Sequence, residues 1–213
     1  MLKKILVIQT AFIGDAVLAT ALLEKLHQFY PNAALSMLIR KGNEGLFDQH
    51  PYLDQVLIWN KKNGKYKDLW RLLKQIRSTK FDLVVNVQRF AATGLLTAFS
   101  GAKHTVGFDK NPISFLFSKS IQHLISDQHN PLHEIERNQQ LIVHLTDEKP
   151  AHPLLYPTEK DFNRIKKYQH HPYICVAPAS VWYTKQFPEG KWIDFIKLVP
   201  YPVYILGGPG DHA

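Results

Sequence analysis

A short loop after the first apolar run of the chain offers a base for chemistry on a hydroxyl group. The apolar run covers residues 5–8 within a β-rich segment at residues 4–9, and Asp15 stands where the chain turns from this segment into a helix. A carboxylate at a helix start can remain ionised, and in that form Asp15 could take a proton from a bound hydroxyl. The neighbouring Gly14 permits close approach of a ligand to the backbone. The structural alternative is that Asp15 only caps the helix.

A second loop, residues 177–188, has the composition of a diphosphate-binding segment. It contains Ser180, Thr184 and Lys185 among small residues. Hydroxyl donors combined with one mobile positive charge suit a diphosphate group. An ordinary exposed loop is the alternative.

Residues 61–80 are strongly basic. The segment carries lysine or arginine at 61, 62, 65, 67, 71, 74, 77 and 80, against a single acidic residue, Asp68. On a helix, Leu69, Leu72, Leu73 and Ile76 gather on one face and Lys67, Arg71 and Lys74 on the opposite one. The basic face is either a solvated surface or a contact with anionic headgroups of a membrane.

The segment His133-Glu134-Ile135-Glu136-Arg137-Asn138 combines an imidazole with charged groups. Adjacent His133 and Glu134 do not share a helical face, so the spacing does not predict zinc binding. The eleven histidines form no His-Glu-x-x-His motif, and one cysteine, Cys175, excludes a disulfide framework or a cysteine metal cluster. We therefore predict no metal site, and a helix-capping role for His133 and Glu134 is favoured over catalysis.

The composition narrows the class of partner. The formal net charge is +8 and the calculated isoelectric point is about 9.4, which favours anionic partners. Nucleic acid is the weakest of these, because the basic residues lack interleaved aromatic side chains and no recognition motif is present. No Gly-x-Gly-x-x-Gly motif follows the first strand, which argues against a dinucleotide cofactor there. The single cysteine fits a reducing cytoplasm, and no apolar run approaches the roughly 20 residues that span a bilayer.

Alternating apolar periods position these loops. The pattern predicts strands at residues 4–9, 35–39, 56–59, 83–87 and 105–107, and helices at residues 17–29, 67–78, 91–99 and 131–145. Such alternation indicates a doubly wound α/β fold with a parallel sheet, whose ligands lie beyond the carboxyl ends of the strands.

A second domain is expected after a linker. Residues 146–157 contain three prolines and no apolar period, so we place the linker there and the two domains at residues 1–150 and 151–213. The second domain is predicted to contain helices at residues 159–168 and 189–198 and strands at 173–176 and 203–206. The glycine-rich turn at 207–213 normally leads into a helix, so we expect this domain to be incomplete in the chain.

Four segments together resemble the lipopolysaccharide heptosyltransferases of glycosyltransferase family 9. They are residues 5–20 with Ile13-Gly14-Asp15, residues 82–88, residues 133–138, and residues 179–192 with the pattern Trp-x-x-Lys-x-Phe-Pro-x-x-x-Trp. The resemblance runs the length of the chain. It implies a GT-B fold, in which two Rossmann-like domains with parallel sheets face each other across a cleft, the second being incomplete here.

The resemblance also implies an activity. Family members transfer a heptose from ADP-heptose to the inner core of lipopolysaccharide, with inversion and without a metal or other cofactor. Asp15 matches the catalytic base. The donor-binding residues would be Ser180, Thr184, Lys185, Gly207 and Gly208, and the acceptor-side residues would be Gly14, Gln88, His133 and Arg137. The implied partners are ADP-heptose, a lipopolysaccharide core or lipid A acceptor, and an anionic membrane surface, in the cytoplasm and peripheral to the inner membrane.

One departure from the family pattern limits this reading. Family members carry an Asp-Ser-Gly-x-x-His-like motif further along the second domain, and no such motif is present in this chain. Part of the donor site is therefore expected to lie outside it, and the chemistry belongs to the complete enzyme. The alternatives are a related GT-B transferase for another surface polysaccharide and a non-catalytic nucleotide-binding α/β module.

Overall fold

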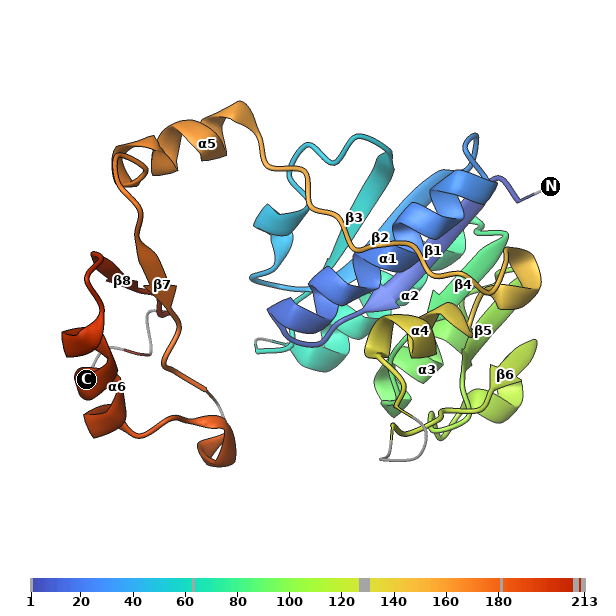
Figure 1. Ribbon diagram of the computed structural model, residues 1–213. Helices are drawn as coiled ribbons and strands as arrows, with labels where there is room; N and C mark the ends of the chain where they lie inside the picture. The colour runs from blue at the N-terminus through green and yellow to red at the C-terminus, as the bar shows by residue number, and fades with distance from the viewer. Residues whose placement is uncertain (1, 63, 127–130, 181, 209–210, 212–213) are drawn as a thin grey trace. The chain divides into compact units, whose positions relative to one another are not determined.

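The computed structural model describes residues 2–62, 64–126, 131–180, 182–208 and 211. The chain divides into two compact units, Met1–Pro157 and Thr158–Ala213. Each unit has its own sheet (Figure 1).

The first unit is built on a six-stranded parallel sheet. Its strands are β1 (Lys4–Gln9), β2 (Ala34–Arg40), β3 (Leu53–Trp59), β4 (Leu83–Asn86), β5 (His104–Phe108) and β6 (Lys119–Ile121). They lie in the order β3-β2-β1-β4-β5-β6, and every neighbouring pair is parallel. The predicted parallel sheet is confirmed.

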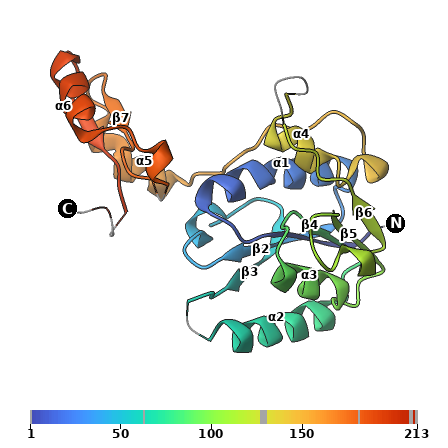
Figure 2. The same ribbon diagram turned by 90° about the horizontal axis from the view of Figure 1, so that it is seen from below.

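Four helices cover the two faces of this sheet. They are α1 (Ile13–Phe29), α2 (Lys65–Thr79), α3 (Ala91–Ala98) and α4 (Glu134–Gln139). Figure 2 shows α1 and α4 on one face of the sheet and α2 and α3 on the other. This arrangement buries both faces, which is why the central strands are continuously apolar.

The side chains of β1 alternate between two apolar cores. Ile5 and Val7 belong to the core that α1 covers, and Leu6 and Ile8 belong to the core beneath α2; all four are fully buried. The alternation follows from the period of two in a strand. Because β1 is central and buried on both sides, it holds the loop that follows it in a fixed position.

Two elements differ from the sequence predictions. Strand β6 was not predicted, because its three residues are partly or fully exposed and carry no apolar period. The prediction of one helix over residues 131–145 is wrong. Helix α4 ends at Gln139, and a short 3-10 helix follows at Val143–Leu145. Between them the Leu141 N–H donates to the Asn138 carbonyl, three residues earlier, as in a 3-10 turn. Leu141 is fully buried in the core.

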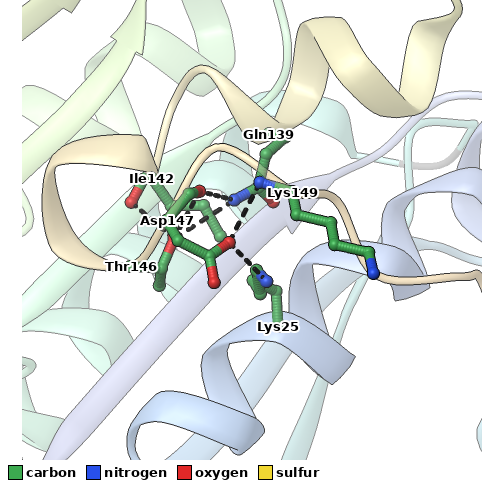
Figure 3. Close-up of polar contacts among 6 residues, drawn as sticks. All are labelled: Lys25, Gln139, Ile142, Thr146, Asp147 and Lys149. Atoms are coloured by element: carbon green, nitrogen blue, oxygen red, sulfur yellow. Dashed lines mark hydrogen bonds and ion pairs between the residues drawn. The ribbon is translucent and has the colours of Figure 1, made fainter.

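The segment after α4 is fastened to the first unit. Lys25 Nζ of α1 lies 2.5 Å from Asp147 Oδ1, and Gln139 Nε2 donates to Thr146 Oγ1 at 3.1 Å and to the Asp147 carbonyl at 2.7 Å (Figure 3). Further along, Leu154 N–H donates to Thr20 Oγ1 at 3.0 Å.

Tyr156 makes the last of these attachments. Its hydroxyl lies 3.0 Å from Glu24 Oε1 of α1, which also accepts from the Tyr52 hydroxyl. Burial raises the pKa of Glu24, and the hydrogen bond from Tyr156 opposes that rise. Because these contacts continue through Tyr156, the compact units divide after Pro157, further along the chain than the boundary at residue 150.

Asp82, just before β4, connects three segments at the amino ends of the strands. Its carboxylate accepts from Lys103 Nζ at 2.7 Å and from the N–H groups of Lys3 and Lys4 at 2.8 and 3.0 Å. The hydrogen bond from Lys103 and those two N–H groups hold the pKa of Asp82 well below its usual range.

We therefore expect the substitution Asp82→Asn to destabilise the protein in a pH-dependent way. A lowered pKa in the folded state stabilises the fold above the unfolded pKa, which is about 3.9, and this stabilisation is lost as the pH falls through the folded value. The difference in unfolding free energy between wild type and variant should be full at pH 7 and shrink in acid. Urea unfolding at pH 7 and in acid measures this difference in unfolding free energy. A difference that does not change with pH would contradict the stabilising role of the Asp82 carboxylate.

The second unit contains a two-stranded parallel sheet. Its elements are α5 (Glu159–Ile165), β7 (Ile174–Val176), α6 (Glu189–Leu198) and β8 (Val203–Ile205), with β7 paired to β8. The order and type of these elements agree with the sequence prediction, and 3-10 turns follow α5 at Lys166–Tyr168 and precede α6 at Tyr183–Lys185. In the part of the chain that the structure describes, no helix has the length and apolarity needed to cross a membrane.

Candidate functional site

The candidate acceptor site lies at the carboxyl ends of the strands in the first unit. The strand order reverses direction at β1, which has β2 on one side and β4 on the other. Open α/β sheets bind ligands in the crevice at such a switch point. The loop after β1 leads to Gly14 and Asp15 in the first turn of α1, and the segment after β4 carries Gln88.

Asp15 occupies the first turn of α1. Its Oδ2 accepts a hydrogen bond of 3.2 Å from the N–H of Phe12, the residue that caps the helix, and its side chain is half-buried. This bond is the capping interaction expected as the structural alternative. It also holds the carboxylate at the edge of the sheet while part of it remains accessible to a ligand.

Gly14 leaves space beside that carboxylate. A Cβ atom placed on Gly14 would meet no atom within 4 Å among the described residues. The backbone of the loop is therefore open to a ligand at this position.

Buried amide groups fix the ends of β1 and β4. The Gln9 side-chain oxygen accepts from Gln88 Nε2 and, at 3.2 Å, from Ala11 N–H. Asn111 Nδ2 donates to the carbonyls of Gln88 and Phe90, both at 3.0 Å. Gln88 is buried, so the structure places this predicted acceptor-side residue where it supports the loop after β1.

Three polar atoms at this edge lack a partner. They are Thr10 Oγ1, Asn86 Nδ2 and Gln88 Oε1, all buried and without a hydrogen bond among the described residues. Buried polar atoms are normally paired, so an unpaired group indicates a place where water or a ligand group completes the network. Their position beside the Asp15 loop supports a binding site there.

Lys61 brings positive charge to the same loop. Its Nζ donates to the Thr10 carbonyl at 2.5 Å and lies 4.8 Å from the Trp59 ring centroid. Burial, reinforced by repulsion from Arg40 and Lys65, lowers the pKa of Lys61 to about 8. The sequence marked Lys61 only as part of a basic run, because its contact with Thr10 depends on how β3 and β1 lie in the sheet.

His133 is the N-cap residue of α4 and Arg137 lies in its last turn, and both make contacts within that helix. His133 Nδ1 accepts from Ile135 N–H at 3.2 Å, and Glu136 Oε2 accepts from His133 N–H at 2.8 Å. Arg137 pairs with Glu134 at 3.4 Å. The capping role favoured from the sequence is therefore present. A ligand contact of either residue is a proposal.

His123 lies beside the end of β5, where its N–H donates to Asp109 Oδ1 at 2.9 Å. The pKa of His123 is lowered first by burial and second by repulsion from Arg137, and the Asp109 carboxylate opposes this shift. The surroundings of His123 therefore contain both signs of charge.

The candidate donor site lies in the second unit. Because β7 and β8 are adjacent and parallel, the loops after Val176 and Ile205 leave the same edge of the sheet. These loops carry Ser180 and the Gly207-Gly208 turn. The structure thus brings together two predicted donor-binding segments that lie far apart in the sequence.

Two of these predicted residues already make polar contacts within the second unit, and a third is exposed. Gly208 N–H donates to the Asp211 carboxylate at 2.6 Å, so the turn already holds a negatively charged oxygen. Ser180 Oγ accepts from Trp182 N–H at 3.2 Å. Lys185 is exposed at the end of its 3-10 turn.

A cavity of about 810 Å³ lies beside these loops, within the second unit. Thr184, Phe187 and Trp192 are among its lining residues. Trp192, the last residue of the pattern noted in the sequence, has a buried Nε1 without a hydrogen-bond partner among the described residues, so its N–H can donate to a ligand. No group of three or more His, Cys, Asp or Glu side chains in the described ranges has the arrangement of a metal site.

Comparison with known proteins gives consistent matches. A lipopolysaccharide heptosyltransferase 3 from Escherichia coli is 23% identical over 212 residues, which is 93% of this chain and 62% of that protein. The crystal structure of a family 9 glycosyl transferase from Veillonella parvula matches with a TM-score of 0.75 at 19% identity, over 98% of this chain and 64% of the other. The structure of the E. coli ADP-heptose lipopolysaccharide heptosyltransferase II matches with a TM-score of 0.74 at 20% identity, over 98% and 66%.

The chain therefore spans less than two thirds of the length of each of these proteins. The structural likeness confirms the predicted fold, an α/β architecture of the GT-B type with parallel sheets. The family model of glycosyltransferase family 9 (heptosyltransferase) matches residues 69–212, about two thirds of the chain. The chain belongs to glycosyltransferase family 9, the heptosyltransferase family.

Proposed function

We propose that the complete protein transfers a heptose from ADP-heptose to the inner core of lipopolysaccharide, with Asp15 as general base. The observation that carries the proposal is the placement of Asp15 at the β1/β4 switch point, half-buried and beside an open backbone at Gly14. Family membership supplies the type of reaction. The similar heptosyltransferases of E. coli supply the donor and the acceptor class.

The proposed step is a displacement with inversion. The acceptor hydroxyl gives its proton to the Asp15 carboxylate while its oxygen forms a bond to the anomeric carbon of the heptose. The bond from that carbon to the diphosphate oxygen breaks, and ADP leaves with the electron pair. Attack from the face opposite to the leaving group inverts the anomeric centre, and the positive charge of Lys185 stabilises the departing diphosphate without a metal.

The two units have different parts in this proposal. The first unit, with Gly14, Gln88, His133 and Arg137, would hold the acceptor. The second unit, with its Ser180, Thr184, Lys185, Gly207 and Gly208 loops, would hold the donor. The sequence led to the same proposal with a boundary after residue 150, whereas the compact units divide after Pro157. The reaction would take place in the cytoplasm, at the inner face of the inner membrane.

The direct test is heptose transfer by the complete protein. Release of the nucleoside diphosphate is measured with ADP-heptose and a lipopolysaccharide-core acceptor, and release of ADP should require both substrates. UDP- and GDP-activated sugars serve as controls for the donor. Release with another activated sugar and none with ADP-heptose would identify a related transferase for another polysaccharide. Nucleotide binding without turnover on any acceptor would indicate a non-catalytic module.

A further inference from the structure

The positive charge of the chain is concentrated on and beside α2. Residues 61–80 hold eight Lys or Arg and one acidic residue, a net charge of +7, and the whole chain has a net charge of +8. The remaining residues are therefore nearly neutral in sum. A charge segregated in this way creates a local field that attracts an anionic surface.

The outward face of α2 combines this charge with exposed aromatic side chains. Leu72 and Ile76 are buried against the sheet, whereas Tyr66 is 72% exposed and Trp70 is 64% exposed. Lys67 and Lys74 lie on the same outward face. Aromatic and basic side chains thus interleave on α2, contrary to the sequence-based expectation that the basic residues lack aromatic neighbours.

An apolar groove extends this face towards α3. It has a volume of about 420 Å³ and lies between α2 and α3. The residues that line it are Leu69, Trp70, Leu73, Lys74, Arg77, Leu95, Leu96 and Phe99. Phe99 is 47% exposed at the α3 side, so apolar surface continues from Trp70 across to the second helix.

The cations on this surface are not equivalent. Arg71 is engaged with Asp68 at 2.6 Å and with the Ile58 carbonyl at 3.0 Å. Arg77 donates to the Phe99 carbonyl at 3.0 Å. Neither Lys67 nor Lys74 has an ion pair or side-chain hydrogen bond with any residue that the structure describes. These two ammonium groups are therefore available to an external anion.

We propose that the α2 face, defined by Tyr66, Lys67, Trp70, Lys74 and Phe99, binds the surface of an anionic lipid bilayer. The rings enter the headgroup region, where tryptophan and tyrosine are favoured, and the lysines contact lipid phosphates. A bilayer fits better than nucleic acid because four leucines line much of the groove, and leucine side chains bury favourably among acyl chains but neither hydrogen-bond to bases nor stack on them.

The proposal rests on the proposed function, in which the acceptor is carried by a lipid. The basic segment begins at Lys61, which bonds the Thr10 carbonyl in the loop that leads to Asp15. The basic segment that contains α2 therefore contacts the loop of the candidate acceptor site directly, through Lys61. Binding at α2 would hold the Asp15 loop close to the membrane that displays the acceptor.

Vesicle sedimentation tests the surface directly. The protein should sediment with vesicles of phosphatidylcholine mixed with phosphatidylglycerol. With vesicles of pure phosphatidylcholine it should remain in the supernatant. Each basic residue near an anionic surface strengthens binding about fivefold, so Lys67→Glu/Lys74→Glu should weaken it by at least about 25-fold. Trp70→Ala should weaken it roughly tenfold, the order expected when one large apolar side chain leaves the interface.

The matched control is Lys160→Glu/Lys166→Glu, which makes the same charge change on exposed lysines of the second unit. It should reduce binding far less. An equal loss in both double variants would overturn the assignment to α2, and so would equal binding to both kinds of vesicle. Stronger binding to single-stranded RNA than to the anionic vesicles would also overturn it. Circular dichroism and thermal unfolding confirm that each variant is folded.

A soluble acceptor separates this inference from the function itself. The α2 variants should transfer heptose to a delipidated core oligosaccharide as fast as wild type. Wild type that binds anionic vesicles but transfers no sugar would contradict the proposed function alone. Wild type that transfers sugar but does not bind the anionic vesicles would contradict only the proposal that the α2 face binds a membrane.

Discussion

Replacement of Asp15 by asparagine should lower the transfer rate of the complete protein by about 100- to 10,000-fold, the usual contribution of a general base. The amide keeps the size of the carboxylate but cannot accept the proton of the acceptor hydroxyl. It can still accept the 3.2 Å hydrogen bond from Phe12 N–H, so the cap of α1 remains. Stability should therefore fall by less than about 1 kcal/mol, the value of a carboxylate near a helix N-terminus.

The measurement is ADP release under single-turnover conditions, together with ADP affinity by calorimetry. Affinity should stay unchanged, because the donor loops lie in the second unit. Asp161→Asn is a matched control: Asp161 holds the same position in α5 and its Oδ2 accepts from Thr158 N–H at 2.8 Å. The control should transfer at the wild-type rate. If Asp15→Asn did the same, Asp15 would be a helix cap and nothing more.

The parts of the fold that the sequence predicted are those with strong local signals. Strand β1 is an uninterrupted apolar run because it is buried on both faces, and α2 has a clear amphipathic period because one face contacts the sheet. The short β6 has neither signal. The helix predicted at residues 131–145 failed for a different reason: Leu141 and Ile142 fit a helical period, but both are fully buried in the core after the chain has turned. Tertiary packing determined where α4 ends.

The candidate site shows the same limit. The position of Asp15 follows from local order along the chain, one strand followed by one helix. The contact of Gln9 with Gln88 joins residues 79 apart, and that of Lys61 with Thr10 joins residues 51 apart. No local pattern specifies such pairs, because they depend on β4 lying beside β1 and on the path of the chain after β3. The sequence therefore predicted where the loops lie along the chain, but not the long-range hydrogen bonds that hold them in place.

Lys185→Ala should cause the second large loss of activity. The exposed ammonium group stands in the loop after β7, on the same edge of its sheet as the Gly207-Gly208 turn. In the proposed reaction it meets the diphosphate, whose charge grows as the anomeric bond breaks. A hydrogen bond to a charged group contributes about 1.5–3 kcal/mol, so transfer should fall roughly 10- to 100-fold.

The division of that loss between binding and chemistry is the informative quantity. If Lys185 acts mainly on the leaving group, kcat should fall more than the affinity for ADP-heptose, because the interaction strengthens in the transition state. Lys185→Arg should restore part of the rate, since the charge is kept. Lys197→Ala removes an equivalent exposed charge from the last turn of α6 and should change neither quantity. Equal small effects of Lys185→Ala and Lys197→Ala would show that the loop after β7 contributes only general positive charge, and the diphosphate would then have to be held by other groups.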